Sequence, residues 1–294
     1  MNISFELYKV FYYAAKELNF SEAANKLYVS QSAVSQSIKT LEEALNCRLF
    51  SRIKKQVQLT QEGEILFKHV EQAFNYLKTG ERSIREIHSL KQGEIRIGAS
   101  DTICKYYLLP YFKQFNQIYP QIKISVTNRT SPSCIDLLEK GLVDVGVINI
   151  PQQFNSKQLR VKKLKTIQDV FIAGKSLEHL RDQELTLKDL QDYPLLSLEK
   201  HTSTREFFDA LIKEHAVDLT PEIELGSVDL LIELAKIGLG VSFVVQEYIT
   251  KELVEDQIFI LNIREKIPPR YLGIITNDNL PVPLAAQRFI DLLQ

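Results

Sequence analysis

The stretch from Asn19 to Thr60 reads NFSEAANKLYVSQSAVSQSIKTLEEALNCRLFSRIKKQVQLT and decides how the first part of the chain folds. Ser21 is expected to cap a short helix, and Ser30, after a tight turn, a second and longer one. The apolar residues of both helices recur at helical spacing: Ala23, Ala24 and Leu27, then Val34, Ile38, Leu41 and Leu45. The pattern predicts a helix-turn-helix whose second helix packs through one face.

The other face of the second helix is polar, as in a helix that enters a DNA groove. Its hydrogen-bonding side chains, with those at the helix starts, are our candidate DNA contacts: Ser21, Ser30, Gln31, Ser32, Ser35, Gln36 and Lys39. Such side chains read base edges and phosphates in a major groove, and a Gln such as Gln31 can bridge an adenine. The alternative is an ordinary solvated face. We favour DNA contact because a basic hairpin follows.

That hairpin is predicted for residues 47–60, after Asn46 ends the second helix in a left-handed conformation. Four cations surround the expected turn between two short strands: Arg48, Arg52, Lys54 and Lys55. A cationic hairpin beside a groove-reading helix is typical of a wing that grips phosphate or the minor groove. Arg52, Lys54 and Lys55 therefore join the candidate DNA contacts.

A long helix is expected over residues 61–91, capped by Thr60. Its apolar residues alternate in steps of four and three, with Gly80 filling one place: Leu66, Val70, Ala73, Leu77, Ile84 and Ile87. Such a helix is roughly 46 Å long at 1.5 Å per residue. The seam is either the face through which two copies dimerise or a face lying on the chain's own core. We favour a dimer seam.

From Gly93 onward, expected strands alternate with expected helices. This alternation predicts parallel sheets with helices on both faces, in two lobes with a crevice between them. The fold class is thus a multi-domain chain: an all-α winged helix-turn-helix head (1–60), a linker helix (61–92) and an α/β two-lobed domain (93–294). Lobe I is expected over about 93–164 plus 270–294, and lobe II over about 165–269.

Composition and motifs exclude several classes of protein. Cations exceed acids in residues 1–91 and acids exceed cations afterwards, which suits a head that meets nucleic acid. We find no signal peptide, no apolar run of membrane-spanning length, and three widely spaced cysteines, so we expect a bacterial cytoplasmic, nucleoid-associated protein. The histidines show no metal spacing, and there is no phosphate loop or nucleophile elbow. We therefore expect no metal, no cofactor and no catalysis.

The first ninety residues closely resemble the LysR-type transcriptional regulators. The rest of the chain resembles them more loosely. The motifs that carry the resemblance include Phe20-Ser21-x-Ala23-Ala24-x-x-Leu27, Ser30-Gln31-Ser32-Ala33-Val34-Ser35, Leu49-Phe50-x-Arg52 and Leu59-Thr60-x-x-Gly63. The resemblance implies a winged helix-turn-helix, a linker-helix dimer and an effector domain folded like periplasmic binding proteins. It also implies base-reading or near-base roles for Gln31, Ser32 and Ser35.

The resemblance further implies effector contacts at strand ends and helix starts in the body, where ligands bind in open α/β sheets. They fall in four segments: Ser100, Asp101 and Thr102; Thr127, Asn128 and Arg129, in a segment that extends to Thr130; Asn149; and Thr202 and Ser203, in a loop from His201 to Thr204. Free amides and hydroxyls at a helix start favour an anion. The alternative is ordinary helix capping. Asp101 suits an anion poorly unless Arg129 or Lys105 offsets it, or the effector carries an amino group.

We therefore predict a sequence-specific regulator that binds double-stranded promoter DNA under the control of a small-molecule effector in the inter-lobe cleft. The resemblance implies self-association as a homodimer or homotetramer, contact with RNA polymerase if the protein activates, and no membrane partner. The rival hypotheses are a solute-binding receptor, which needs an export signal, and an enzyme on the same scaffold, which needs a catalytic motif. A redox role for Cys104 or Cys134 is the less favoured alternative to two reduced, packed thiols.

Overall fold

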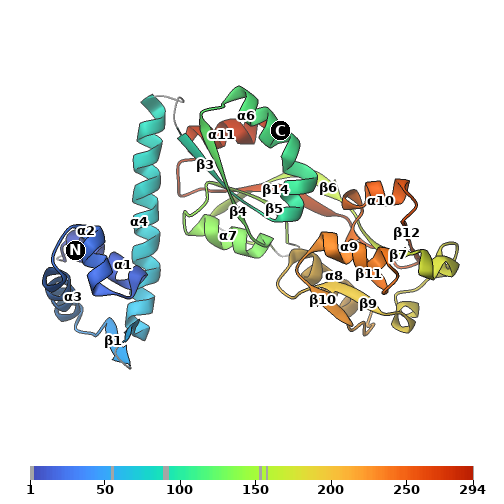
Figure 1. The fold of residues 1–294 in the computed structure, drawn as a ribbon, viewed down its shortest axis with the longest axis horizontal. Coiled ribbons are helices and arrows are strands. Elements are labelled where there is room, and N and C mark those ends of the chain that lie inside the picture. Colours follow the sequence, from blue (N-terminus) through green and yellow to red (C-terminus); the bar gives the residue numbers. More distant parts are fainter. Residues whose placement is uncertain (1–2, 54–55, 89–92, 152–153, 157, 294) are drawn as a thin grey trace. The chain divides into compact units, whose positions relative to one another are not determined.

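The computed structural model describes residues 3–53, 56–88, 93–151, 154–156 and 158–293, in two compact units, residues 1–80 and residues 81–294. In the first unit, three helices precede a two-stranded antiparallel hairpin and the start of a long helix (Figure 1). Their bounds are α1 Phe5–Glu17, α2 Phe20–Leu27, α3 Gln31–Leu45, β1 Phe50–Ile53, β2 Gln56–Leu59 and α4 Gln61–His88. The order is that of a winged helix-turn-helix.

The caps of these helices agree with the sequence in all but one place. Asn19, not Ser21, caps α2: its side-chain oxygen accepts from the Ser21 and Glu22 amides at 2.9 and 3.3 Å. The helix begins at Phe20, so Ser21 already lies in its first turn and the expected cap was wrong. The Ser30 cap is confirmed by a 3.2 Å bond from the Ala33 amide, and Asn46 is left-handed with φ 51°.

The predicted seam of α4 divides between two environments. Leu66 and Val70 pack into the core of the head, and Phe67 and Phe74 face α1, where the Phe74 and Tyr12 rings stack 4.7 Å apart. The chain's own core therefore covers the first part of the helix, which is the alternative we had disfavoured. Leu77 and Ile84 are 50% and 62% exposed, and Ala73 is exposed as well. The Ile87 side chain and Lys91 lie outside the described residues.

The second unit holds two five-stranded sheets, one in each lobe (Figure 1). Lobe I has strand order β4-β3-β5-β14-β6. Its elements are β3 Gly93–Ala99, α5 Asp101–Ile103, a π-helical turn Cys104–Leu108, α6 Leu109–Ile118, β4 Ile122–Asn128, α7 Ser131–Glu139, β5 Val145–Asn149, β6 Leu159–Ile167, β14 Arg270–Asn277 and α11 Leu284–Leu292.

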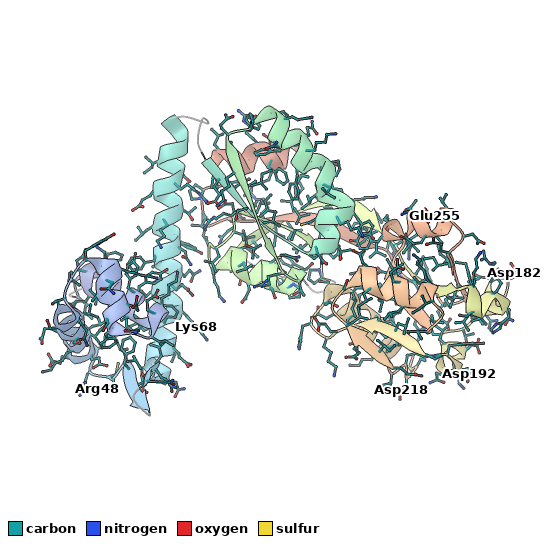
Figure 2. The ribbon with its side chains drawn as sticks, viewed as in Figure 1. Arg48, Lys68, Asp182, Asp192, Asp218 and Glu255 are labelled. Atoms are coloured by element: carbon teal, nitrogen blue, oxygen red, sulfur yellow. The ribbon has the colours of Figure 1, made fainter. Side chains whose placement is uncertain are left out.

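Lobe II has strand order β10-β9-β11-β7-β12. Its strands are β7 Asp169–Gly174, β8 Glu184–Leu185, β9 Leu195–Leu198, β10 Ile223–Leu225, β11 Val241–Val245, β12 Ile258–Ile260 and β13 Asn262–Ile263. Its helices are α8 Ser203–Glu214, α9 Val228–Lys236, α10 Thr250–Val254 and the 3-10 turns Lys175–Leu180, Asp189–Asp192 and Gln246–Tyr248. Acidic residues lie exposed around this lobe (Figure 2): Asp182, Asp192, Asp218 and Glu255.

Both sheets are mixed, so the expectation of parallel sheets was wrong. The chain crosses from lobe I to lobe II between β6 and β7 and returns at β14. Consequently β14 runs antiparallel to β5 and β6, and β7 runs antiparallel to β11 and β12. These crossings make a two-stranded hinge beneath the cleft. Among the described residues, no helix has the length and apolar character that a bilayer span requires.

Candidate DNA-reading face and effector pocket

The polar residues of α3 lie where a groove-reading helix presents them. Gln31, Ser32, Gln36 and Lys39 are exposed, and Ser35 is half-buried. The Ser30 and Ser32 hydroxyls are 2.9 Å apart, which ties the cap to the first turn. The helix thus offers its N-terminal half to a partner while Val34, Ile38 and Leu41 hold it from behind.

A hollow of about 800 Å³ opens beside the start of α3. It is lined by Gln31 and Ser21, by the segment Glu17–Phe20, and by Gln56, Val57 and Gln58 of β2. Gln56 and Gln58 are exposed and were not among our candidates. Their signal was the alternation QVQL, in which every second residue faces solvent.

The wing is fastened to the end of α3 by one buried carboxylate. Glu42 accepts from the Leu49 and Phe50 amides at 2.8 and 3.2 Å and pairs with Arg48 at 2.8 Å. This carboxylate fixes the start of β1 against the reading helix. In the hairpin Arg52 pairs with Val57; the candidate contacts Lys54 and Lys55 lie outside the described residues.

A second pocket, of about 230 Å³, is lined by residues of both lobes. All of the predicted effector-binding residues line it except Thr127. Thr130 and Thr204, which lie in the predicted effector segments, line it as well. The other lining residues were not predicted: Ser131, Leu198, Gly226, Val228 and Tyr248. Residues more than a hundred positions apart meet here because the chain crosses between the lobes twice.

The starts of α5, α7, α8 and α9 all contribute to this pocket. First-turn amides carry partial positive charge, so their convergence favours an anion. Two of the hydroxyls cap helices, which is the alternative role considered for them from the sequence. Ser100 accepts from the Ile103 amide at 3.2 Å, and Thr202 accepts from the Arg205 amide at 3.3 Å. Ordinary capping and a converging set of helix starts are therefore both present.

In the part of the chain that the structure describes, two buried polar atoms of residues that line the pocket have no hydrogen-bond partner: the Asn149 Oδ1 and the Ser203 Oγ. Both residues are 8% exposed. A buried polar atom left unpaired costs about 1–3 kcal/mol, so each calls for an explanation. A bound ligand that supplies the missing bonds is one.

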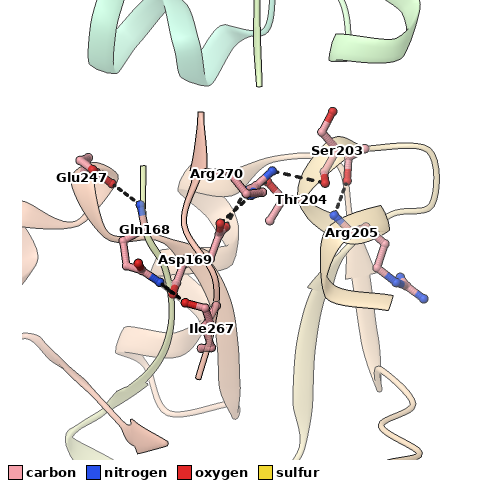
Figure 3. Close-up of polar contacts among 9 residues, drawn as sticks. Gln168, Asp169, Ser203, Thr204, Arg205, Glu247, Ile267 and Arg270 are labelled. Carbon is pink, nitrogen blue, oxygen red and sulfur yellow. Dashed lines mark hydrogen bonds and ion pairs between the residues drawn. The ribbon is translucent and has the colours of Figure 1, made fainter. Parts of the chain in front are cut away.

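A buried ion pair joins the two strands at which the chain crosses between the lobes (Figure 3). Arg270 at the start of β14 donates to both oxygens of Asp169 at the start of β7, at 2.5 and 2.6 Å. The same guanidinium donates to the Ser203 carbonyl at 3.3 Å and the Thr204 hydroxyl at 3.1 Å. The hinge is thus bonded to the loop that lines the pocket.

A second contact joins the lobes at the rim. Lys105 Nζ and the Tyr106 hydroxyl both bond Asp229 of α9, at 2.9 and 2.7 Å. Burial raises the pKa of Tyr106 to about 12, with help from the Asp229 hydrogen bond. Burial opposes ionisation of Asp229, yet bonds from Lys105 and Tyr106 hold its pKa below the usual value. Lys105 is therefore engaged by Asp229 and does not offset Asp101.

The far end of α4 is anchored to lobe I by a buried carboxylate. Asp144 accepts from Arg82 of α4, from Arg96 Nη2 at 2.8 Å and from the Arg96 amide at 2.9 Å. Asp144 directly precedes β5, and Asn149, the last residue of that strand, lines the pocket. One fully buried strand thus connects the pocket with the linker helix.

The pKa values of the Cys104 and Cys134 thiols are raised, not lowered. Burial, with a smaller contribution from Asp101, raises the pKa of Cys104 to about 11. Burial also raises the pKa of Cys134 to about 11. A sensing thiol needs the opposite shift. The described residues bring together no group of His, Cys, Asp and Glu side chains that could hold a metal ion.

Comparison with known proteins agrees with this architecture. Residues 5–64 match the model of the bacterial regulatory helix-turn-helix protein of the lysR family, and residues 88–294 match the LysR substrate binding domain. A probable RuBisCO transcriptional regulator of Cyanidioschyzon merolae is 29% identical, over 92% of this chain and 91% of its own. The HTH-type transcriptional regulator CysL of Bacillus subtilis is 26% identical, over 99% and 96%.

Solved structures share the fold. CbnR, complexed with its target DNA, superposes with a TM-score of 0.65 at 18% identity, over 99% of both chains. The regulatory domain of Synechocystis CcmR, in complex with 2-PG, superposes with a TM-score of 0.62 at 23% identity, over 69% of this chain and 96% of that one. The chain belongs to the LysR family: it is a DNA-binding transcriptional regulator with an effector-binding domain, and not an enzyme.

Proposed function

We propose that two copies of this regulator bind promoter DNA and that a small anion in the inter-lobe pocket changes how they bind it. The observation that carries the proposal is the convergence of four helix starts on one pocket lined by both lobes. A ligand there touches both lobes, so it binds best to one lobe arrangement and shifts the population toward it.

For DNA binding, the residues proposed to read bases are Gln31, Ser32 and Ser35, with Ser21, Ser30, Gln36 and Lys39 beside them. Arg52, Lys54 and Lys55 are proposed to hold the phosphate backbone. The exposed N-terminal half of α3 and the attachment of the wing through Glu42 support this assignment. CbnR, which shares the fold, was solved on its target DNA.

For assembly, the proposed surface is the exposed part of the α4 seam. Leu77 and Ile84 lie uncovered on a helix whose earlier turns are buried in the head. Isolated exposed apolar residues are common, but a seam at heptad spacing favours a paired helix. A homodimer, or a pair of homodimers, in the bacterial cytoplasm is proposed, with RNA polymerase contact if the output is activation.

For the effector, the candidate contacts are the pocket residues Ser100, Asp101, Thr102, Asn128, Arg129, Asn149, Thr202 and Ser203. Thr127 does not line the pocket, so we propose for it only a structural role within β4. CcmR was solved with 2-PG in its regulatory domain, and this supports a ligand-binding role for the matching part of our chain.

The proposal is tested with purified full-length protein and fluorescent DNA from its own upstream region. Operator affinity should exceed affinity for scrambled DNA and fall steeply with salt between 50 and 200 mM. A panel of small carboxylates and phosphates should include compounds that raise the melting temperature and shift operator affinity. Equal binding of both DNAs would refute sequence-specific DNA binding. If no anion in the panel stabilises the protein, the anionic effector is refuted.

A further inference from the structure

The effector pocket is poor in net charge. Its charged lining residues are Asp101 and Arg129, which are both exposed and carry opposite charges. The nearby Arg270 is neutralised by Asp169, and Lys105 is engaged by Asp229. The positive potential that remains comes from the helix starts, which together suit one acidic group rather than a highly charged ligand.

Most of the lining is neutral and able to hydrogen-bond. Hydroxyls and amides dominate it: Ser100, Thr102, Asn128, Thr130, Ser131, Asn149, Thr202, Ser203, Thr204 and Tyr248. A small pocket of this kind suits a compact ligand whose own surface is largely polar and uncharged. A purely apolar ligand would leave the buried Asn149 Oδ1 and Ser203 hydroxyl without the partners that they need.

Asn149 specifies what the ligand must supply. Its Oδ1 is an acceptor only, it is buried, and no residue that the structure describes donates a hydrogen bond to it. Its backbone amide is already used, donating to the Ser131 hydroxyl at 3.1 Å. A carboxylate or phosphate oxygen placed against this atom would set two acceptors against each other. The atom needs a donor, and an alcohol is the simplest one that a small acid carries.

Ser203 indicates where the acidic group of the ligand binds. It is the first residue of α8, so its backbone lies at the positive end of a helix, and its hydroxyl is buried and unpartnered. The hydroxyl can donate to an acidic oxygen held by the first-turn amides. Arg270 bonds the Ser203 carbonyl from behind and fixes this turn in place.

We propose that the effector is a compact hydroxylated anion: its acidic group binds at the start of α8 with Ser203, and its hydroxyl donates to the Asn149 Oδ1. This inference rests on the proposed function of the pocket and adds the chemical class of its ligand. A site built to accept from a hydroxyl discriminates strongly against the analogue that lacks it, because the acceptor stays unpaired.

The test uses pairs of anions with equal charge that differ in their hydroxyls: glycerol 3-phosphate against propyl phosphate, and glycerate against propionate. Each is titrated into the full-length protein by calorimetry. The hydroxylated member of a pair should bind at least tenfold more tightly. In Asn149→Leu this preference should fall to about one, with the affinity for propyl phosphate and propionate unchanged.

Two further variants keep the test decisive. Ser203→Ala should weaken both members of a pair by the same factor, because it acts on the acidic group that they share. Thr127→Val, on the neighbouring strand but outside the pocket, should leave both affinities and the preference unchanged. Should Asn149→Leu fail to fold, the preference in the wild type and the Ser203→Ala result decide.

Equal affinity within each pair would overturn the inference, since water would then satisfy Asn149, and would leave the anionic effector of the proposed function standing. A preference that survives in Asn149→Leu would overturn it as well. If none of the four compounds binds and the wider panel of anions does not bind either, the proposed function of the pocket fails together with the inference.

Discussion

Arg270 and Asp169 form a buried, two-bond ion pair between strands that are 101 residues apart in sequence. Their side chains are 3% and 0% exposed. The pair joins the two points at which the chain crosses between lobes, and Arg270 also bonds Ser203 and Thr204 beside the pocket (Figure 3). It thus joins the two hinge strands to each other and to the start of α8.

Removing one partner of this pair should be costly. Arg270→Ala leaves the Asp169 carboxylate buried without its cation, and we expect a loss of about 3–5 kcal/mol in the free energy of unfolding. Urea denaturation followed by circular dichroism measures it. Arg160→Ala, which breaks the exposed pair with Asp278, is the matched control and should cost about 1 kcal/mol or less. Similar losses in the two variants would contradict the role given to Arg270.

Introducing a charge into the exposed seam of α4 should prevent dimerisation. Leu77→Glu places two carboxylates opposite each other in a paired helix, so we expect monomers at micromolar concentration. Light scattering after size exclusion reports the mass. Val254→Glu, at an apolar residue on α10 that is 83% exposed, should leave the mass unchanged. A Leu77→Glu variant that keeps the wild-type mass would exclude this face of α4 as the interface.

Signal transfer should depend on Asp144. Because β5 joins this anchor of Arg82 and Arg96 to the pocket residue Asn149, we expect a lobe movement at the pocket to be transmitted to α4. Asp144→Asn should keep effector affinity within about twofold and reduce the effector's influence on operator affinity, by up to about 2 kcal/mol of coupling. Paired titrations with and without effector measure both quantities. Asp278→Asn, at an exposed ion pair, is the control and should leave the coupling unchanged. Unchanged coupling in Asp144→Asn would show that Asp144 does not take part in signal transfer.

The buried thiols predict a pH dependence. Burial raises the pKa of Cys104 and Cys134 from 9.0 to about 11, so between these values the folded protein keeps protons that the unfolded chain loses. Their stabilising contribution is complete below pH 9 and is lost as the pH rises toward 11. Unfolding free energies across this range should fall less steeply in a Cys104→Ala, Cys134→Ala double variant. Operator binding that changes on peroxide treatment at pH 7 would argue instead for a reactive thiol.

Features of the fold that depend on residues close together in the sequence were predictable, and features that depend on distant residues were not. The head was predictable because its helices are specified by local signals: Ser30 and Asn46 mark the start and end of α3 from within the stretch itself. Even there, Asn19 and Ser21 compete as caps two residues apart, and Asn19 is the cap because α2 already begins at Phe20. The hinge strands were missed. LRVKKLKTI in β6 is an edge strand with exposed lysines, and its antiparallel partner β14 lies a hundred residues away.

The pocket shows the same limit. Strand ends and helix starts identified most of its candidates, yet Thr127 and Asn128 differ because successive residues of a strand point to opposite faces, and only Asn128 lines the pocket. Tyr248 and Val228 carried no local signal. They reach the pocket only because the chain passes through the hinge twice.

The central claim is that the exposed start of α3 reads DNA sequence. Fluorescence anisotropy of Gln31→Ala on operator and on scrambled DNA tests it most directly, with Gln117→Ala, an exposed glutamine of α6, as the control. We predict a loss of about 1–3 kcal/mol on the operator with almost none on scrambled DNA. An equal loss on both DNAs, or no loss on the operator, would contradict the account.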